Sequence, residues 1–382
     1  MSDRFAEIVK FIRSQFPAEN PVPLHAPRFT GNEKKYLAEC IDSTFVSYVG
    51  KFVTDFEEHI KRFTGASNAV AMVNGTAALQ MALSVCGVKP GDEIITQPLT
   101  FVATANAIRH AGGEPVFVDV DRDTLGMSPQ KLEDFLREET AMKHDGCHNR
   151  STGGRIAACV PMHTFGHPAR IEEIVEICGR YGIVVVEDSA ESLGSFYGAR
   201  HTGTFGKAGI LSFNGNKLVT TGGGGMLITN DDVVAARARH ITTTAKQKHP
   251  WAFYHDEIGY NLRMPNVNAA IGCAQMEKIE FILSNKRELA DRYRSFFESM
   301  SIPFVSGLED CRANYWLNAI LFADREEREA FLEYSNGNGI QTRPAWVLMN
   351  RLPMFADCVH GDLGNAGWLE DRLVNIPSSF RL

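Results

Sequence analysis

The first half of the chain alternates short apolar runs with longer segments in which apolar residues recur at helical spacing. The apolar runs predict strands at 69–73, 93–96, 115–118, 156–161 and 183–187. Helical spacing between them predicts helices over 75–85, 101–110 and 169–181. Strands alternating with helices are typical of a mainly parallel sheet covered on both faces. The pattern therefore predicts an α/β fold.

The pattern changes after residue 239. Residues 242–264 (TTTAKQKHPWAFYHDEIGYNLRM) have no clear period and mix basic with aromatic residues, as active-site loops often do. Beyond them, 267–289 predicts one long helix. Residues 1–16 predict a short amphipathic helix, and the polar stretch 138–155 predicts a surface excursion rather than a domain boundary.

Composition limits the functions that the chain can have. Its 382 residues, 44% hydrophobic and 22% charged, are enough for a large core and two lobes. The net charge of −7 gives no general attraction to nucleic acid or to anionic lipid. The N-terminus does not resemble a secretion leader, and the apolar runs are too short to span a bilayer. We therefore expect a cytoplasmic protein that binds neither nucleic acid nor membrane.

Cysteine and histidine spacing argues against a disulfide framework and a metal site. The eight cysteines are scattered, form no C-x-x-C pair and lie in several cases within apolar runs, where cysteine acts as a small core residue. His163 and His167 are four residues apart, but Pro161 and Pro168 disfavour a shared helical face. We expect no metal.

The segment from Val186 to Gly225 contains the most informative chemistry. Asp188 follows an apolar run in VEDSAESLG, and Lys217 lies in LSFNGNKLVTTGGGG between small polar residues and four glycines. An acid, a lysine and a nest of small residues suit pyridoxal 5′-phosphate (PLP), whose ring nitrogen needs a carboxylate and whose aldehyde needs an amine. A lone lysine is more often a solvated surface residue, so this spacing alone is a weak motif.

The flanking motifs make the interpretation as a PLP site specific. Along most of its length the chain resembles the DegT/DnrJ/StrS sugar-nucleotide aminotransferases. The resemblance implies the PLP-dependent aspartate aminotransferase fold, fold type I, with a large domain followed by a smaller C-terminal α+β domain. We expect the boundary between 1–245 and 246–382. The matching motifs follow in order: TDFEEHIKRFTGASNAVAMVNGTAALQMAL, GDEIITQPLTFVATANAIRHAGGEPVFVDVD, VPMHTFGHPA, VEDSAESLGSFYG and GYNLRMPNVNAAIG.

The resemblance assigns roles to individual residues. Lys217 is expected to bond the cofactor aldehyde and to move the proton, and Asp188 to face the ring nitrogen. The cofactor phosphate is expected at a turn from strand to helix, where backbone N–H groups attract a dianion. The resemblance also implies that the cofactor-binding set includes Asn74, Gly75, Thr76, Ala77, Phe101, Ser212 and Asn261.

Two of these roles, and a run of glycines beside them, have further implications. Phe101 takes the ring-stacking position, although an aromatic residue on a helix is usually a core residue. Asn261 matches a residue that reaches the neighbouring subunit's cofactor phosphate, which implies a homodimer with shared active sites. Gly222–Gly225 replace the usual Gly-Glu-Gly-Gly and predict a tight hairpin near the cofactor.

Glu191 departs from the Gln or His that many members of the family carry. We expect it near the cofactor's ring hydroxyl, with a helix-capping or surface role as the alternative. This glutamate is similar to that of the branch involved in legionaminic acid biosynthesis.

The segment IQTRPAWVLMNRLPMF also departs from the family pattern and offers Arg343 for a diphosphate, Trp346 for an apolar sugar face and Asn350 for an acetamido group. In the alternative reading, Trp346 belongs to the core and Arg343 to a surface ion pair.

The expected reaction moves an amino group from glutamate to a nucleotide-linked 4-keto-6-deoxy sugar, with a UDP-linked N-acetylhexosamine favoured. PLP-dependent sugar dehydratases share the fold but replace the lysine, so Lys217 argues against them. A non-catalytic binding protein is disfavoured by the intact set of Asp188, Ser212 and Lys217.

Overall fold

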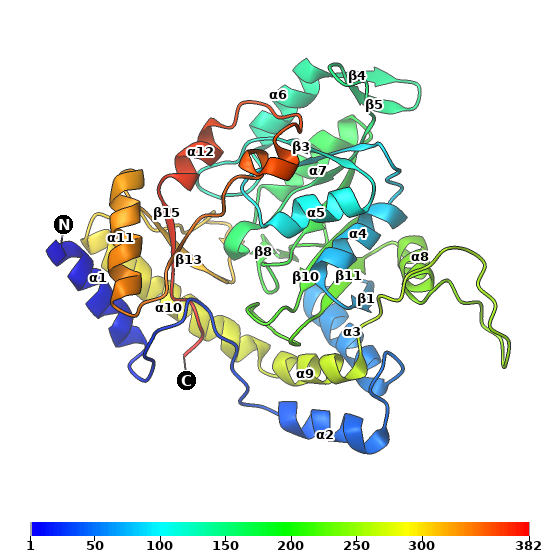
Figure 1. Cartoon of the computed structure of the whole chain (residues 1–382), viewed down its shortest axis with the longest axis horizontal. Coiled ribbons are helices and arrows are strands. Elements are labelled where there is room, and N and C mark those ends of the chain that lie inside the picture. Colours follow the sequence, from blue (N-terminus) through cyan, green and yellow to red (C-terminus); the bar gives the residue numbers. More distant parts are fainter. Residues whose placement is uncertain (1, 382) are drawn as a thin grey trace.

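The computed structural model describes residues 2–381 and is built around a seven-stranded, mostly parallel sheet (Figure 1). Strands β10, β7, β6, β2 and β3 run parallel, whereas β11 pairs antiparallel with both β10 and β1. The predicted α/β class and the five predicted strands are confirmed. In spatial order the strands are β1 (Asn68–Met72), β11 (Gly225–Thr229), β10 (Ala208–Ser212), β7 (Val184–Asp188), β6 (Ile156–Val160), β2 (Glu93–Thr96) and β3 (Glu114–Phe117).

Helices cover both faces of this sheet because successive strand residues point to opposite sides. In β1, Val70 and Met72 pack with α4 and α8, whereas Ala69 and Ala71 pack with α3 and α9. The first face carries α4 (Gly75–Val85), α5 (Val102–His110) and α8 (Asp232–Thr242). The opposite face carries α3 (Lys51–Thr64), α9 (Asn266–Met276), α6 (Pro129–Glu139) and α7 (Ile171–Arg180).

The C-terminal part forms a second, smaller layer. Its antiparallel sheet has the order β13 (Asn318–Leu321), β15 (Leu373–Ile376) and β14 (Arg343–Pro344). It shares a core with α10 (Ile279–Ser299), α11 (Arg325–Gly337) and the N-terminal helix α1 (Ser2–Gln15). In Figure 1, α1 accordingly lies beside α11, although the two helices are far apart in sequence. The division at residue 245 stays a prediction.

The remaining elements are two further helices, short strands and 3₁₀ turns. Among the residues described, no helix is long and apolar enough to cross a membrane. The smaller elements are α2 (Glu33–Ser43), α12 (Gly364–Glu370), β4 (Thr140–Lys143), β5 (Gly146–Asn149), β8 (Phe196–Tyr197), β9 (Arg200–His201), β12 (Cys311–Arg312), and the 3₁₀ turns η1 (Thr164–Gly166), η2 (Met349–Arg351) and η3 (Pro353–Phe355).

The prediction of one long helix over 267–289 is wrong. The chain forms α9 and α10 with a break at Glu277 and Lys278, where the N-terminal segment crosses the helix ends. Asn32 donates to the Glu277 carboxylate (2.7 Å), and the Lys278 amine donates to the carbonyl and hydroxyl oxygens of Thr30. These long-range contacts fix a break that the local apolar pattern does not indicate.

Candidate active site

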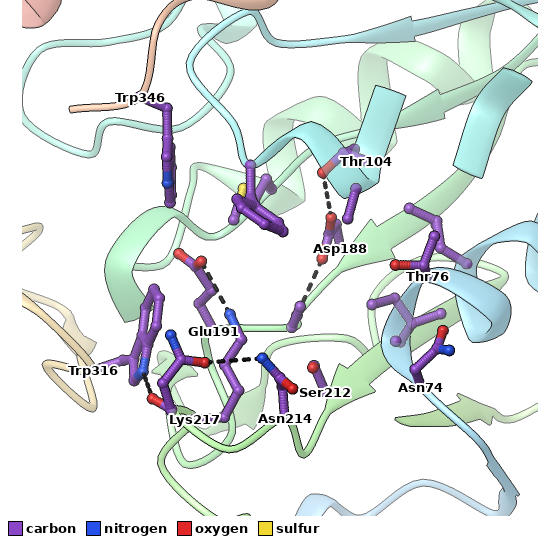
Figure 2. A pocket seen from close by; sticks show the side chains of 18 residues that line it. Asn74, Thr76, Thr104, Asp188, Glu191, Ser212, Asn214, Lys217, Trp316 and Trp346 are labelled. Atoms are coloured by element: carbon purple, nitrogen blue, oxygen red, sulfur yellow. Dashed lines mark hydrogen bonds and ion pairs between the residues drawn. The ribbon is translucent and has the colours of Figure 1, made fainter. Parts of the chain in front are cut away.

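A cavity of about 320 Å³ opens where the central sheet meets the C-terminal layer (Figure 2). Asp188 ends strand β7, Ser212 ends β10, and helix α4 begins at Gly75. The carboxyl ends of parallel strands and the amino ends of the following helices form the usual ligand site of α/β folds. Residues from the C-terminal layer close the other side of the cavity, so both layers contribute to one site.

Asp188 lies at the inner end of the cavity with its carboxylate held in place. Its Oδ2 accepts a hydrogen bond from the Thr104 hydroxyl (2.7 Å), and its Oδ1 accepts one from the backbone N–H of Ala190 (3.1 Å). The side chain is buried, with 4% exposure. Two neutral donors fix the carboxylate without neutralising it, which leaves its negative charge available to a cationic ring nitrogen.

Lys217 enters the same cavity from the connection between β10 and β11. Its Nζ lies 3.1 Å from Oε1 of Glu191 and 3.9 Å from the centre of the Trp316 ring. The other Glu191 oxygen accepts a hydrogen bond from the backbone N–H of Phe165 (2.8 Å). The lysine is therefore oriented by a carboxyl group on one side and by an aromatic face on another.

Glu191 is buried at 2% exposure, which excludes the surface role that the sequence left open. Burial raises the pKa of Glu191 to about 7, and the positive charge of Lys217 acts in the opposite direction. This carboxyl group can therefore hold or release a proton near neutral pH beside the lysine amine.

The start of α4 is the turn at which the sequence motifs predict that the phosphate binds, and it is called the phosphate turn below. Asn74 caps the helix, because its side-chain oxygen accepts a hydrogen bond from the backbone N–H of Ala77 (2.8 Å). This contact occupies the Ala77 N–H, and Ala77 does not belong to the cavity lining. The backbone N–H groups of Gly75 and Thr76 lie in the first helical turn, where a helix has no internal acceptors for them. They form a site suited to an anion.

Two glycines allow the backbone segments around this turn to approach closely. A Cβ atom on Gly75 would lie 3.0 Å from Cβ of Ser212, and one on Gly225 would lie 2.3 Å from the carbonyl carbon of Asn74. The predicted tight hairpin at Gly222–Gly225 is wrong, because residues 213–224 form a longer connection that contains Lys217. The run of glycines instead brings β11 against the phosphate turn.

Aromatic side chains line the outer part of the cavity. Phe101 is 48% exposed and lines the cavity instead of joining the core. Trp346 lies 4.8 Å from Phe165 and 6.2 Å from Phe101, measured between ring centroids. The indole N–H of Trp316 donates to the carbonyl oxygen of Asn216 (2.7 Å), which fixes that ring beside Lys217.

Besides Ala77, three predicted residues lie outside the lining of this cavity. Asn261 is exposed and pairs with Thr243 in an isolated bridge. Arg343 is exposed and donates to the side-chain oxygen of Asn336 (3.0 Å) and to the carbonyl oxygen of Thr342 (2.7 Å). Asn350 has a buried side-chain oxygen without a hydrogen-bond partner in the described structure. Their roles stay predictions.

Sequence reasoning missed Thr104 and Trp316, which contact Asp188 and Lys217. Thr104 lies on the helical segment TFVATAN, and its contact with Asp188 spans 84 residues. Trp316 lies in a mostly apolar run that resembles core, and its contact with Asn216 spans 100 residues. No local motif in the sequence indicates either contact.

The residues present fit PLP. A lysine amine and a fixed carboxylate open into one cavity with an aromatic side chain, and the N-terminus of an 11-residue helix provides free backbone donors. These are the groups that the aldehyde, the ring nitrogen, the ring face and the phosphate of PLP require. The fold and the site therefore define a PLP-dependent transferase with the aminotransferase fold.

Comparisons with known proteins identify the family. The sequence pattern of the DegT/DnrJ/EryC1/StrS aminotransferase family matches residues 27–382. A GDP-perosamine synthase from Escherichia coli O157:H7 is 36% identical over 94% of this chain and 93% of its own length. A second GDP-perosamine synthase, from Vibrio cholerae, is 31% identical over 94% of each chain. The solved structure of the aminotransferase TlmJ from Streptoalloteichus hindustanus is 25% identical, with a TM-score of 0.84 over 94% of this chain and 93% of that one.

The chain belongs to the DegT/DnrJ/EryC1/StrS aminotransferase family. It is an enzyme of the PLP-dependent sugar aminotransferase type. The expectation from the sequence motifs is thereby confirmed for fold, enzyme class and cofactor.

Proposed function

We propose that the enzyme transfers an amino group from glutamate to a nucleotide-linked 4-keto-6-deoxy sugar. The observation that supports this most strongly is that the amine of Lys217 and the carboxylate of Asp188 open into one cavity walled by aromatic rings. Bound PLP supplies a conjugated ring that accepts electrons while the amino group moves between donor and acceptor.

The protein's own residues divide the work between holding the cofactor and moving a proton. Lys217 would hold the cofactor through its amine, and the same amine, once free, would carry the proton. Glu191, 3.1 Å from the Lys217 amine, orients it and shares its proton. The carboxylate of Asp188 stabilises the positive charge of the ring nitrogen. The backbone N–H groups of Gly75 and Thr76, together with Ser212, hold the phosphate.

The favoured acceptor is a UDP-linked 4-keto-6-deoxy-N-acetylhexosamine, used for a bacterial surface glycan or a nonulosonic acid. The aromatic faces of Trp316 and Trp346 suit the apolar face and the 6-deoxy methyl group of such a sugar. Asn350, which lies outside the lining of this cavity, stays a proposed contact for the acetamido group. A GDP-linked 4-keto-6-deoxy sugar is the second candidate, because two GDP-perosamine synthases are 36% and 31% identical to this chain.

We further propose that the enzyme acts as a homodimer. Large apolar side chains gather on two segments that nothing in the described chain covers. Apolar surface of this kind marks protein interfaces. The exposed residues are Phe29, Phe45, Val46, Tyr48, Val49, Trp251, Phe253, Tyr254 and Ile258.

The reaction is tested by incubating the enzyme with glutamate and separate UDP-, GDP- and dTDP-linked 4-keto-6-deoxy sugars. Formation of 2-oxoglutarate together with one aminosugar is the expected result, with the UDP-linked N-acetyl sugar turned over fastest. Turnover of only a GDP- or dTDP-linked sugar would reject the favoured acceptor. The absence of 2-oxoglutarate, with another amino donor active, would reject glutamate.

A further inference from the structure

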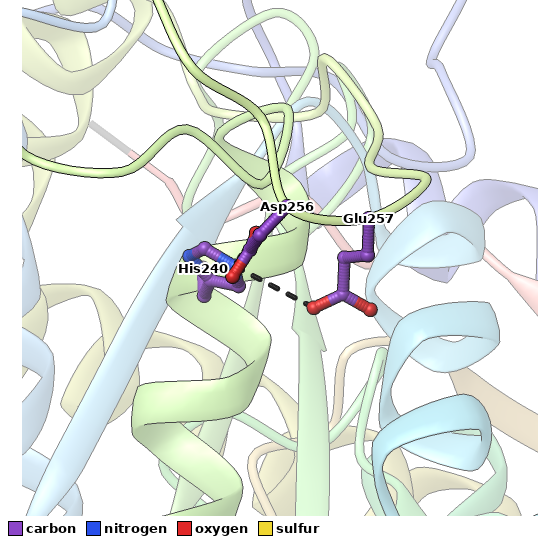
Figure 3. Close-up of side chains that lie close together, drawn as sticks. All are labelled: His240, Asp256 and Glu257. Carbon is purple, nitrogen blue, oxygen red and sulfur yellow. Dashed lines mark hydrogen bonds and ion pairs between the residues drawn. The ribbon is translucent and has the colours of Figure 1, made fainter.

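In the part of the chain that the structure describes, one group of side chains has the composition and spacing of a metal site. His240, Asp256 and Glu257 meet at the end of α8, outside the cavity (Figure 3). His240 pairs with both acids. Arg237 also pairs with Glu257, and Gln247 donates to Asp256. The group is satisfied internally and fixes the following segment to α8, so we assign no metal to it.

A buried asparagine behind the cavity contacts both groups that flank the Lys217 amine. Asn314 precedes β13, is 0% exposed and does not belong to the cavity lining. Its Nδ2 donates to the backbone carbonyl oxygen of Glu191 (2.8 Å), and its Oδ1 accepts the backbone N–H of Trp316 (2.7 Å). One side chain therefore joins the residues whose carboxyl group and aromatic face orient Lys217 (Figure 2).

The side-chain amide of Asn314 has one orientation that suits its surroundings. Nδ2 also donates to the carbonyl oxygen of Leu193 (2.9 Å), so both of its protons are used. A reversed amide would place Oδ1 against the carbonyl oxygens of Glu191 and Leu193 and would leave the Trp316 N–H without its acceptor. Such losses are costly in a buried site, because water does not replace the missing partner. The contacts therefore require an amide rather than a carboxylate at this position.

Further contacts fix the position of Asn314 itself. Its backbone N–H donates to the hydroxyl oxygen of Ser195 (3.0 Å), and that hydroxyl donates to the carbonyl oxygen of Gly166 (2.6 Å). A Cβ atom on Gly166 would overlap Oδ1 of Asn314, and the φ of 93° at this position favours glycine. The preceding residue, Phe165, donates its backbone N–H to the carboxyl group of Glu191 (2.8 Å). The contacts therefore hold Glu191 by its backbone and by its side chain.

The geometry around the Lys217 amine is sensitive to small displacements of these flanking groups. Nζ lies within hydrogen-bonding distance of Oε1 of Glu191 (3.1 Å) and 3.9 Å from the centre of the Trp316 ring. A misplacement of about 1 Å can slow a reaction that depends on positioned groups by about a hundredfold. The residue that holds both flanking groups can therefore control the reactivity of the amine.

We propose that Asn314 is a positioning residue for the Lys217 amine and acts by holding Glu191 and Trp316 against it. This inference rests on the proposed role of Lys217 in holding the cofactor. It goes beyond that role, because it names the side chain that sets the position of the amine. The contact between Asn314 and Glu191 spans 123 residues, so no local motif indicates it.

The first test measures how fast the full-length, cofactor-free enzyme captures PLP at Lys217. Borohydride quenching at successive times, followed by peptide mass spectrometry, gives the rate constant for pyridoxyl label on this lysine. Asn314→Ala is expected to lower the rate constant about tenfold or more, because the amine loses its fixed position. Asn318→Ala is the matched control and is expected to match the wild type. Asn318 is equally buried, and its amide donates to the hydroxyl oxygen of Ser378 (3.0 Å).

The outcomes of this test separate the positioning role from the role of Lys217. Label on Lys217 at equal rates in the wild type and Asn314→Ala would overturn the positioning role alone. A loss of rate that Asn318→Ala reproduces would trace the effect to general destabilisation and would also overturn it. A wild type without label on Lys217 would reject the proposed role of Lys217 and, with it, this inference.

A variant of the same shape separates the hydrogen bonds from the volume of the side chain. Asn314→Asp replaces the two donors by an oxygen that faces the carbonyl oxygens of Glu191 and Leu193. It is expected to slow capture at least as much as Asn314→Ala. Ser195→Ala, which removes only the acceptor of the Asn314 N–H, is a milder variant if Asn314→Ala does not fold, and it is expected to slow capture too. Capture at the wild-type rate by both Asn314→Asp and Ser195→Ala would overturn the proposal.

A double-mutant cycle tests whether Asn314 acts through Glu191. Glu191→Gln keeps the backbone carbonyl that Asn314 binds but removes the carboxyl group beside Nζ of Lys217. The slowing of PLP capture by Asn314→Ala is expected to be at least about threefold smaller in Glu191→Gln than in the wild type. Equal slowing in both backgrounds would show that Asn314 acts independently of Glu191 and would overturn the proposal.

Discussion

Glu191 and Lys217 form the unusual pair of this site, because a buried carboxyl group lies 3.1 Å from the lysine that the cofactor requires. Burial raises the pKa of Glu191 to about 7 from 4.5. An acid whose pKa is higher in the folded protein than in the unfolded chain holds its proton more tightly in the folded state. Its contribution to the free energy of unfolding is complete below the unfolded-state pKa and is lost as the pH rises through the folded-state pKa. The cofactor-free protein therefore loses this contribution between about pH 4.5 and pH 7.

Replacing Glu191 by Gln removes the titrating group and should remove that loss. The wild type is expected to lose on the order of 3 kcal/mol more unfolding free energy than Glu191→Gln between pH 4.5 and pH 7.5. Urea unfolding of both cofactor-free proteins across this range measures the difference, with Glu176→Gln, exposed on α7, as the control. Parallel pH profiles for wild type and Glu191→Gln would contradict the assignment.

Lys217 should carry the cofactor through its Nζ atom. Borohydride reduction of the loaded enzyme, followed by peptide mass spectrometry, is expected to place the pyridoxyl group on Lys217. Lys217→Arg keeps the charge but cannot form the same bond, so it is expected to lose covalent labelling completely. Lys286, which is fully buried on α10 and donates to the carbonyl oxygen of Trp316, is an internal control. Label on any other lysine would reject the site.

At the scale of elements, the start of α4 depends on the close approach of β11. A Cβ atom on Gly225 would lie 2.3 Å from the Asn74 carbonyl carbon and 2.5 Å from the Gly75 nitrogen, both of which are backbone atoms that cannot rotate away. Gly225→Ala is therefore expected to push β11 from the phosphate turn, to cost about 1–3 kcal/mol of stability and to weaken PLP retention.

Gly361→Ala is the matched control for this substitution, because nothing lies within 4 Å of its added methyl group. Thermal unfolding and PLP release during dialysis measure both effects. Equal PLP retention by the two variants would mean that the turn tolerates a displaced β11.

The elements that the sequence predicted correctly are those whose determinants are local. Strands β2, β6 and β7 are apolar on both faces because helices cover both faces of the sheet. Their short apolar runs were therefore sufficient to predict them as strands. The position of Asp188 follows from the predicted strand that precedes it. The assignments of Asn74 and Ser212 come from the family resemblance, and the strand that ends at Ser212 was not among the predicted ones. These residues could therefore be assigned to the site from motifs.

The features that the sequence missed depend on contacts between distant segments. The break between α9 and α10 follows from Thr30 and Asn32 crossing the helix ends, 248 and 245 residues away in sequence from their partners. Trp316 reaches Lys217 because its indole binds Asn216, 100 residues away. Periodicity in one segment contains no information about such partners.

At the scale of the whole molecule, the exposed aromatic side chains predict a dimer in solution. Trp251 and Phe253 are each 81% exposed, which is unusual for large apolar residues on a surface that stays in contact with water. Sedimentation of the wild type is expected to give a dimer, and Trp251→Glu/Phe253→Glu is expected to shift it toward monomer. Met142→Glu, at a side chain 57% exposed on β4, is the control and should remain dimeric. A monomeric wild type would contradict the shared-site assembly.

Asn261 tests whether that assembly also shares active sites. The residue lies outside the cavity of its own chain and on an exposed segment, as expected for a side chain that serves a neighbouring subunit. Asn261→Ala is therefore expected to weaken PLP retention several-fold, because one phosphate hydrogen bond is lost. A mixture with Lys217→Ala chains should regain activity, since a hybrid dimer rebuilds one site with both residues intact. The expected recovery is about one quarter of wild-type activity, because random exchange makes half of the dimers hybrid and each hybrid has one complete site of two. Unmixed variants measured at the same total concentration provide the baseline. No recovery, with exchange verified by mass spectrometry of tagged chains, would mean that Asn261 acts within its own chain.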